Sequence, residues 1–246
     1  MNWPRLVAAG TVVVCALLSA SEDGRHLLAA DIEAGEDAVL LEENLDIEIV
    51  SETLARVRYF NRTKVLTVRG VEEHEGASVS YNPSITVREM RGAVISPEGK
   101  RSEVKKQQIF DRAAFADFAL YADSKSRSIV FPGVVPGSTL EHEYEVEMRN
   151  LFYVQGYLRF DLQEWIPARL KTFTVQAPAS FVLRLATQGS PEYVREERDG
   201  RIVHRWRVRD VPALKTEYGM PPADDVDSYV QVYLKAFVYG EHRVDA

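Results

Sequence analysis

The segment from Ile129 to Glu147 restricts the fold of this chain more than any other, because two Pro-Gly turns lead directly into a strictly alternating run. Pro132-Gly133 and Pro136-Gly137 combine the fixed φ of proline with the positive φ that glycine tolerates, which suits tight turns. In the run that follows, core-compatible residues alternate with glutamates, and side chains of a β-strand change face at every residue. The segment therefore predicts turns followed by a β-strand, and it carries no catalytic motif.

The two faces of this predicted strand differ in chemistry. One face carries Leu140, His142, Tyr144, Val146 and Met148, and the other carries Glu141, Glu143, Glu145, Glu147 and Arg149. The glutamate ladder could bind a cation or a basic partner. The interpretation that we favour is a solvated face whose charges pair with a neighbouring strand. The alternating run 201–209, with Arg205, Arg207 and Arg209 on one face, would suit as that neighbour, but the sequence does not show whether the two strands are adjacent.

Two histidines lie on the apolar faces of predicted strands, His142 and His204. Each fits a buried core histidine better than a ligand or a base, and the two could form a site only if one sheet brought them together. With the glutamate ladder they complete the candidate binding residues: Glu141, Glu143, Glu145, Glu147, His142 and His204. No metal-binding spacing and no cofactor motif is present, so we expect neither a metal nor a cofactor.

Residues 1–21 predict a secretory signal peptide. Arg5 is their only charged side chain, an apolar stretch runs from Leu6 to Leu18, and small residues follow up to Ser21. The apolar stretch is shorter than the ~20 residues that span a bilayer, so no stable membrane span is expected after cleavage. Lipidation at Cys15 is not favoured, because valines rather than a small residue precede it. We expect an extracytoplasmic protein, periplasmic or secreted.

Cleavage of this peptide would remove the only cysteine of the chain. The mature protein could then form no disulfide and could use no thiol nucleophile or thiolate metal site. The formal net charge of −7 argues against a nucleic-acid partner, which requires a basic surface. Without a Gly-x-Ser-x-Gly, phosphate-loop or His-Glu-x-x-His motif, the sequence predicts no catalytic residue and no enzyme.

Runs rich in β-branched and aromatic residues recur from Val39 to Tyr239, separated by turn signals such as Asn82-Pro83 and Asp199-Gly200. The recurring helical patterns of a parallel α/β fold are missing. We therefore predict an all-β fold, a large antiparallel β-sandwich of two packed sheets. One short helix or helical loop is expected near residues 111–120, where alanines and phenylalanines replace the alternation.

The predicted domain organisation is simple. Residues 22–36 form a poorly ordered lead-in after the signal peptide, and residues 37–246 form a single β-sandwich domain. The alternative is a division into two β-subdomains near residue 150.

Five segments together resemble a known family. They are Ala38-Val39-Leu40-Leu41, Arg62-Thr63-Lys64-Val65-Leu66, Ser96-Pro97-Glu98-Gly99, Phe131 to Ser138 with Glu143-Tyr144-Glu145, and Val211-Pro212-Ala213-Leu214 with Glu217 and Pro221-Pro222. The pattern resembles the bacterial domain of unknown function 3857 over roughly residues 37 to 240. The resemblance implies a β-sandwich module placed before a transglutaminase-like domain with a Cys, His and Asp triad. The chain stops at Ala246 and the mature part has no cysteine, so no catalytic residue is carried over.

Together these observations predict a non-catalytic exported module that binds or scaffolds in the bacterial envelope. Its expected partner is a transglutaminase-like protein, or an envelope peptide or glycan. Trp165 and Trp206, with several tyrosines, could line a groove for such a ligand, although core packing is the commoner role of such residues. Two alternatives stay open: a cysteine-free hydrolase that uses acidic residues with His142 and His204, and a truncated remnant of a transglutaminase-like protein.

Overall fold

A computed structural model describes residues 35–113, 124–151, 158–215, 219–221, 227–239 and 242–245 of the chain. The predicted signal peptide and the lead-in up to residue 34 lie outside these ranges. Within them β-strands predominate, and the all-β prediction is confirmed. In the described part, no helix is both long and apolar enough to cross a membrane.

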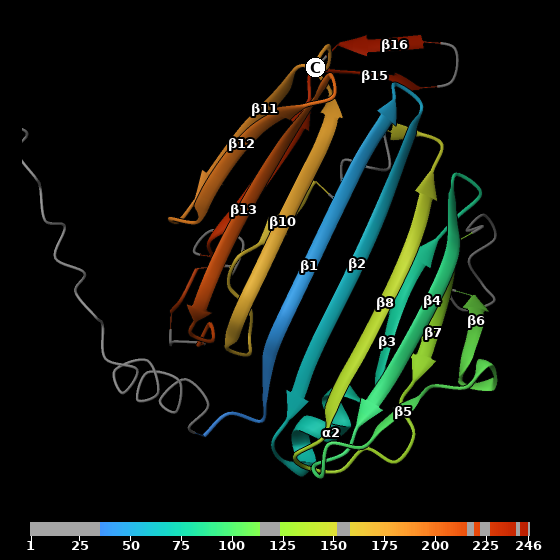
Figure 1. Cartoon of the computed structure of the whole chain (residues 1–246), viewed down its shortest axis with the longest axis vertical. Coiled ribbons are helices and arrows are strands. Elements are labelled where there is room, and N and C mark those ends of the chain that lie inside the picture. Colours follow the sequence, from blue (N-terminus) through green and yellow to red (C-terminus); the bar gives the residue numbers. More distant parts are fainter. Residues whose placement is uncertain are drawn as a thin grey trace, which may run out of the picture.

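One large sheet forms the first layer of the molecule. Its strands are β1 (Ala38–Ser51), β2 (Leu54–Val65), β4 (Ile85–Ile95), β5 (Arg101–Glu103), β8 (Thr139–Met148), β10 (Ala168–Pro178), β12 (Glu192–Arg198) and β13 (Arg201–Val211). These eight strands follow the spatial order β12-β13-β10-β1-β2-β8-β4-β5 (Figure 1). The sheet is continuous across residue 150 of the sequence, because strands from both halves of the chain lie side by side in it.

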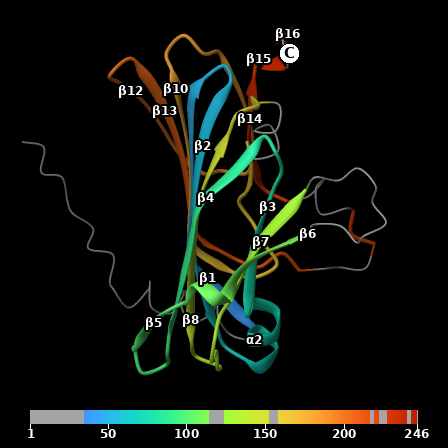
Figure 2. The same ribbon diagram turned by 90° about the vertical axis from the view of Figure 1, so that its right-hand side faces the viewer.

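The second layer is made of smaller pieces. One three-stranded sheet has the order β3 (Gly76–Tyr81), β7 (Lys125–Val130), β6 (Ile109–Ala113), and another has the order β11 (Leu183–Gln188), β14 (Tyr229–Leu234), β9 (Arg159–Asp161). A hairpin of β15 (Ala236–Tyr239) and β16 (His242–Asp245), the helix α2 (Val68–His74) and the 3-10 turn η1 (Lys106–Gln108) complete the described elements. Both three-stranded sheets lie on the same side of the large sheet (Figure 2). The predicted sandwich is therefore present, with its second layer divided into two sheets.

One strand pair of the large sheet is parallel, whereas the prediction was purely antiparallel. Strands β1 and β10 run in the same direction, with Leu45 opposite Phe173. The other neighbouring pairs of this sheet are antiparallel. A parallel pair needs a long crossover connection rather than a hairpin. Here the chain leaves the large sheet after β8, forms β9 in the second layer, and returns as β10 beside β1.

The predicted helix near residues 111–120 is wrong for its first residues. Residues up to Ala113 belong to strand β6, and 114–123 lie outside the described residues. The structure instead places a helix at 68–74, directly after β2, which the sequence analysis did not predict. Thr67 explains why a helix begins here. Its hydroxyl oxygen accepts a hydrogen bond from the Gly70 N–H at 3.1 Å and so caps the helix.

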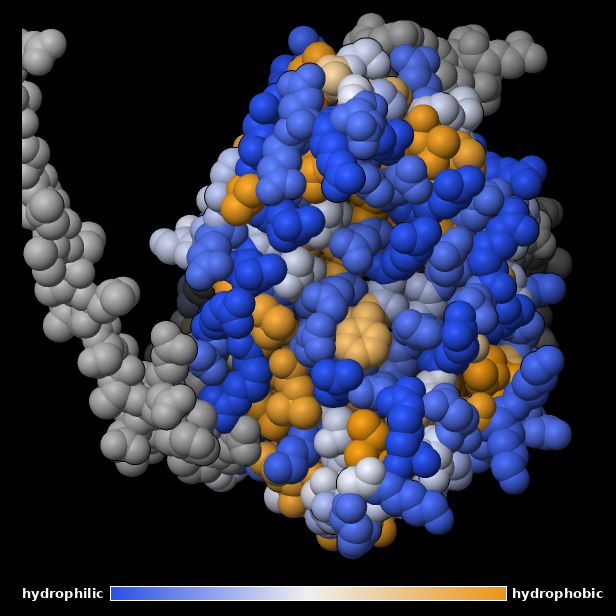
Figure 3. All heavy atoms as spheres, viewed as in Figure 1, coloured by the Kyte–Doolittle hydropathy of each residue, from blue (hydrophilic) through white to orange (hydrophobic). Residues whose placement is uncertain are grey.

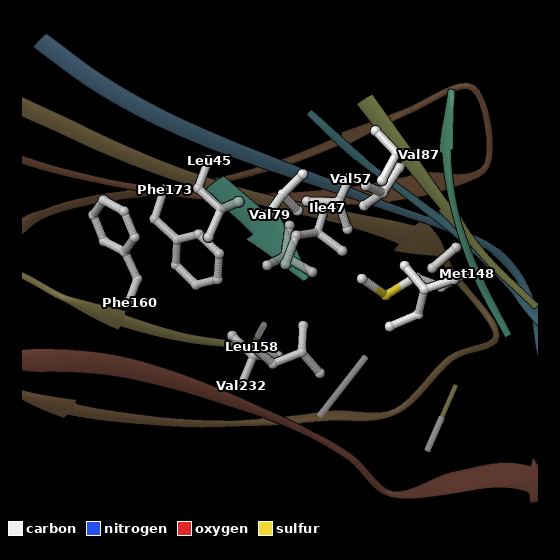
Figure 4. Packing of buried hydrophobic residues seen from close by; sticks show 14 of the residues in the cluster. Leu45, Ile47, Val57, Val79, Val87, Met148, Leu158, Phe160, Phe173 and Val232 are labelled. Atoms are coloured by element: carbon white, nitrogen blue, oxygen red, sulfur yellow. The ribbon is translucent and has the colours of Figure 1, made fainter. Parts of the chain in front are cut away.

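The hydrophobic core fills the space between the two layers (Figure 4). From the large sheet it receives Leu45, Ile47, Val57, Val87, Met148 and Phe173, and from the second layer it receives Val79, Leu158, Phe160 and Val232. We call the face of the large sheet that meets this core the inner face, and the opposite face the outer face. The outer face is predominantly hydrophilic (Figure 3). Two-residue alternation along the strands therefore separates core from solvent, as the sequence predicted for β8.

Candidate functional site

A line of polar side chains crosses the inner face at right angles to the strands. In the strand register, His142 of β8 lies opposite Asn61 of β2, Asn61 opposite Glu43 of β1, and Glu43 opposite Lys171 of β10. Directly opposite residues on one face of a sheet are close neighbours, with strands about 4.8 Å apart. Four adjacent strands thus contribute one continuous row. We call His142, Asn61, Glu43 and Lys171 the polar row.

Hydrogen bonds fix which groups of this row donate and which accept. The Tyr59 hydroxyl lies 2.7 Å from Glu43 Oε1, and because a carboxylate only accepts, the tyrosine donates. The Tyr59 oxygen in turn accepts a hydrogen bond from Asn61 Nδ2 at 3.3 Å. The amide oxygen of Asn61 then faces Thr63, and the Thr63 hydroxyl donates to Asn61 Oδ1 at 2.8 Å. Burial, followed by the adjacent Glu43 carboxylate, raises the pKa of Tyr59 well above its usual range, so the hydroxyl keeps its proton.

Lys171 ends the row as a buried cation with several partners. Its side chain is 1% exposed, and Nζ lies 2.9 Å from Glu43 Oε2 and 2.7 Å from Glu164 Oε1. It also donates to the main-chain carbonyl of Asp161 and lies over the Phe160 ring, 4.8 Å from the centroid. Burial acts to lower the pKa of Lys171, but the two carboxylates outweigh it and the net shift is upward. The lysine is therefore held as a cation.

His142, at the opposite end, has a different environment. Its ring lies 5.6 Å from the Tyr59 ring and 6.2 Å from the Phe131 ring, centroid to centroid. Burial lowers the pKa of His142 to about 4, so the imidazole is neutral near pH 7. None of the described residues hydrogen-bonds to this ring, which leaves one donor and one acceptor nitrogen available.

Three residues of the polar row, His142, Asn61 and Glu43, line the floor of an open cleft of about 380 Å³, a volume in the range of small-molecule sites, while Lys171 lies buried beside Glu43. We call this the inner cleft. One wall comes from the end of helix α2, with Glu73 and His74, and the other from the loop between β9 and β10, with Glu164, Trp165 and Ile166. Burial lowers the pKa of His74 in spite of the nearby Glu73 carboxylate. The cleft therefore brings two neutral histidines together, His74 and His142.

The glutamate ladder lies on the outer face, away from this cleft, and each of its carboxylates faces an arginine. The closest N–O distances are 3.3 Å for Glu145 with Arg58, 3.6 Å for Glu143 with Arg91, 2.9 Å for Glu147 with Arg88 and 2.6 Å for Glu141 with Arg62, and Glu141 also pairs with Arg101. These arginines belong to β2, β4 and β5, not to β13, which carries Arg205, Arg207 and Arg209. Three strands separate β13 from β8. The arrangement is that of a face with cross-strand ion pairs, in which Glu141 is buried between Arg62 and Arg101.

The structure does not bring His142 and His204 together. Both lie in the large sheet with their side chains toward the inner face, but β10, β1 and β2 lie between their strands. Four strand spacings amount to about 19 Å, too far for a shared ligand or proton. His204 instead meets the Tyr193 hydroxyl, 2.8 Å from Nδ1, and stacks against Trp206, which is 2% exposed. The histidine that lines the same cleft as His142 is His74, which sequence spacing gave no reason to choose.

Replacing Lys171 with methionine is expected to lower the free energy of unfolding by about 3–5 kcal/mol, because it leaves the buried Glu43 carboxylate without its cation. The double variant Glu43→Gln with Lys171→Met should lose clearly less, since neither charge then remains. Urea denaturation measures both values. The matched control is Arg58→Met, which breaks the exposed pair with Glu145 and should cost at most about 1 kcal/mol. Equal losses in Lys171→Met and Arg58→Met would contradict the central role of the polar row.

His142 is expected to titrate in the folded protein with a midpoint of about 4, far below the ordinary pKa of 6.5, as NMR of its Cε1–H resonance would show. Because the folded pKa is lower than the unfolded one, the unfolded chain takes up this proton first as the pH falls. The stabilising contribution is therefore complete above about pH 6.5 and is lost as the pH falls from there to about 4.

Comparing the stability of the wild type with that of His142→Phe over this pH range isolates the effect from His204, whose pKa burial also lowers. A midpoint near 6.5 for His142, or an equal pH dependence in the wild type and the variant, would contradict the lowered pKa of this ring.

Comparisons with known proteins agree with this architecture. The model of a protein family, DUF3857, described as a domain of unknown function with a solved structure, matches residues 54–215. No curated protein matches the chain. A protein from Parabacteroides distasonis, described as a "putative protease", superposes with a TM-score of 0.70 and 17% identity over 80% of this chain and 40% of that protein. An M1 zinc metallopeptidase from Deinococcus radiodurans superposes with a TM-score of only 0.39 and 13% identity, over 80% of this chain and 42% of that protein.

The likeness to the Parabacteroides protein concerns the fold alone. The chain spans about two fifths of the length of the two solved proteins that it matches. The family match, in contrast, extends from β2 to the end of β13 and includes most of the polar row. On that ground, the chain belongs to the DUF3857 family.

Proposed function

We propose that this protein is a non-catalytic binding module of the bacterial envelope and that the inner cleft is its ligand site. The observation that carries the proposal is the polar row on the floor of an open cleft. Buried polar groups are costly unless they are hydrogen-bonded, and every residue of the row except His142 has a hydrogen-bond or ion-pair partner among the described residues. The remaining neutral imidazole faces the cleft, where a ligand would complete its hydrogen bonds.

The same contacts support a binding role over a catalytic one. Lys171 is a paired cation, so its amine has no free electron pair for nucleophilic attack. The Tyr59 hydroxyl is committed to Glu43, and its raised pKa makes it a poor proton donor. The hydrolase alternative relied on His142 and His204, which lie on strands too far apart to act on one substrate. The arrangement favours holding a molecule over transforming it.

Family membership gives the proposal a setting. DUF3857 is a domain of unknown function, and we infer an accessory role beside a transglutaminase-like enzyme, as the resemblance of the sequence implies. The 40% coverage of the larger Parabacteroides protein supports a module that works with further domains. In this role the inner cleft would hold an envelope ligand for an enzyme that acts on it.

Export is part of the proposal and can be tested directly. The features of residues 1–21 lead us to expect signal cleavage after Ser21 in a bacterial host. Cell fractionation followed by N-terminal sequencing should find the protein outside the cytoplasm, starting at Glu22. An uncleaved protein in the cytoplasmic fraction would remove the envelope from the proposal and leave the cleft unaffected.

The binding function is tested by titrating the purified protein with four classes of small compounds: neutral sugars, short peptides, polyamines and organic anions. The Cε1–H resonances of His142 and His74 report occupation of the cleft, because both side chains line it. His204 serves as an internal control on the same sheet face, about four strand spacings away.

We expect at least one class to shift His142 and His74 saturably, to leave His204 unchanged, and to be recovered chemically intact. If no class moves His142, the cleft is not a ligand site for such molecules. Conversion of the compound into a product would refute the non-catalytic role.

A further inference from the structure

Trp165 is an exposed indole that the structure holds in place. Its side chain is 57% exposed at the rim of the inner cleft. The residue before it is fixed twice, by the ion pair of Glu164 with Lys171 and by a hydrogen bond from the Leu214 N–H to the Glu164 carbonyl at 2.7 Å. A further bond from the Leu40 N–H to the Pro167 carbonyl, at 2.9 Å, fixes the far end of the loop. The backbone on both sides of Trp165 is therefore held in place, and the flat indole ring is exposed at the rim of the cleft.

The charges around the cleft restrict the ligand. Three carboxylates line it, those of Glu43, Glu73 and Glu164. The cation beneath them, Lys171, is already shared between Glu43 and Glu164. Glu73 in turn pairs with the exposed Arg69 at 2.9 Å, so three carboxylates face two cations. An anionic ligand would meet this remaining negative charge, so the cleft disfavours anions.

The free hydrogen-bonding groups of the floor suit hydroxyl groups. His142 is neutral and offers one donor and one acceptor nitrogen, and a hydroxyl can both donate and accept. The carboxylates at the walls add acceptors for further hydroxyl protons. A ligand that carries several hydroxyls on a compact frame satisfies both kinds of group.

We infer that the inner cleft binds a neutral sugar, a mono- or disaccharide unit that packs one ring face on Trp165 and directs hydroxyls to His142. This inference rests on the proposed binding function and names its ligand class. A sugar ring combines an apolar face of C–H groups with a polar edge, which matches an indole at the rim above a polar floor. The volume of about 380 Å³ is at the lower end of the range for small-molecule sites and suits one or two such rings.

A short peptide is the rival ligand, and the floor is less suited to it. Peptides bind to β-sheets chiefly through main-chain hydrogen bonds to a free strand edge. The four strands of the floor, β8, β2, β1 and β10, are interior strands of the large sheet, with a neighbour on each side. Their main-chain groups are used within the sheet, and the floor offers side chains only.

The test uses four probes with the purified full chain: cellobiose, N,N′-diacetylchitobiose, trialanine and digalacturonate. Isothermal titration calorimetry gives the affinities, and tryptophan fluorescence reports on the exposed indole. We expect at least one neutral disaccharide to bind and to shift the emission of Trp165 to shorter wavelength. Digalacturonate should bind at least about tenfold more weakly than its neutral counterparts, because it faces the wall carboxylates.

Two variants place the sugar at the inferred site. Trp165→Ala should weaken disaccharide binding about tenfold, whereas Trp165→Phe, which keeps an aromatic face, should stay within about threefold of the wild type. His142→Phe should also weaken binding, with folding checked by circular dichroism. Tyr233→Ala, which removes an exposed aromatic side chain that does not line the cleft, is the matched control and should leave binding unchanged.

The outcomes separate this inference from the proposed function. Binding of trialanine with shifts of His142, and no binding of the disaccharides, would overturn the sugar ligand and keep the binding module. Disaccharide binding that Trp165→Ala leaves unchanged would overturn the inferred site. If none of the four probes binds, the sugar inference fails, and the proposed function then depends on the remaining compound classes of the NMR titration.

Discussion

The buried ion pair between Glu43 and Lys171 lies where the two halves of the large sheet meet. It joins β1 to β10, the parallel pair that connects the strands of the first half of the chain to those of the second. Both side chains are almost fully buried, and each charge depends on the other for compensation. The hydrogen-bond chain through Tyr59 and Asn61, the tethered loop at Glu164 and the floor of the cleft all extend from this pair.

The residue pattern within a single segment predicted the strand and its two faces, which depend only on local geometry. The alternation from Leu140 to Met148 predicted β8 within one residue at its start and assigned both of its faces correctly, since the period of two follows from strand geometry. Which strands lie beside β8 depends on register and topology, which a single segment does not contain. The arginines that pair with its glutamates therefore came from β2, β4 and β5 and not from the run 201–209.

The candidate site was only partly visible for the same reason. His142 stood out by its place on an apolar face, but His74, which lines the same cleft, comes from a helix that the sequence pattern did not predict. A usable signal did exist. Glu43, Asn61 and Lys171 occupy core-facing positions of strands whose other inward residues are largely apolar. Single polar exceptions in three strands predict a buried polar feature, although only the register shows that they form one row.

The polar row differs from an ordinary buried polar cluster because part of it lines an open cleft. A buried ion pair is often no more stabilising than apolar residues of similar size, so stability alone does not account for the polar row. Three residues of the row, Glu43, Asn61 and His142, line an open cleft that the exposed Trp165 also lines. Under the proposed binding function, a ligand that completes the hydrogen bonds of His142 would account for both the cost of the row and its access to solvent.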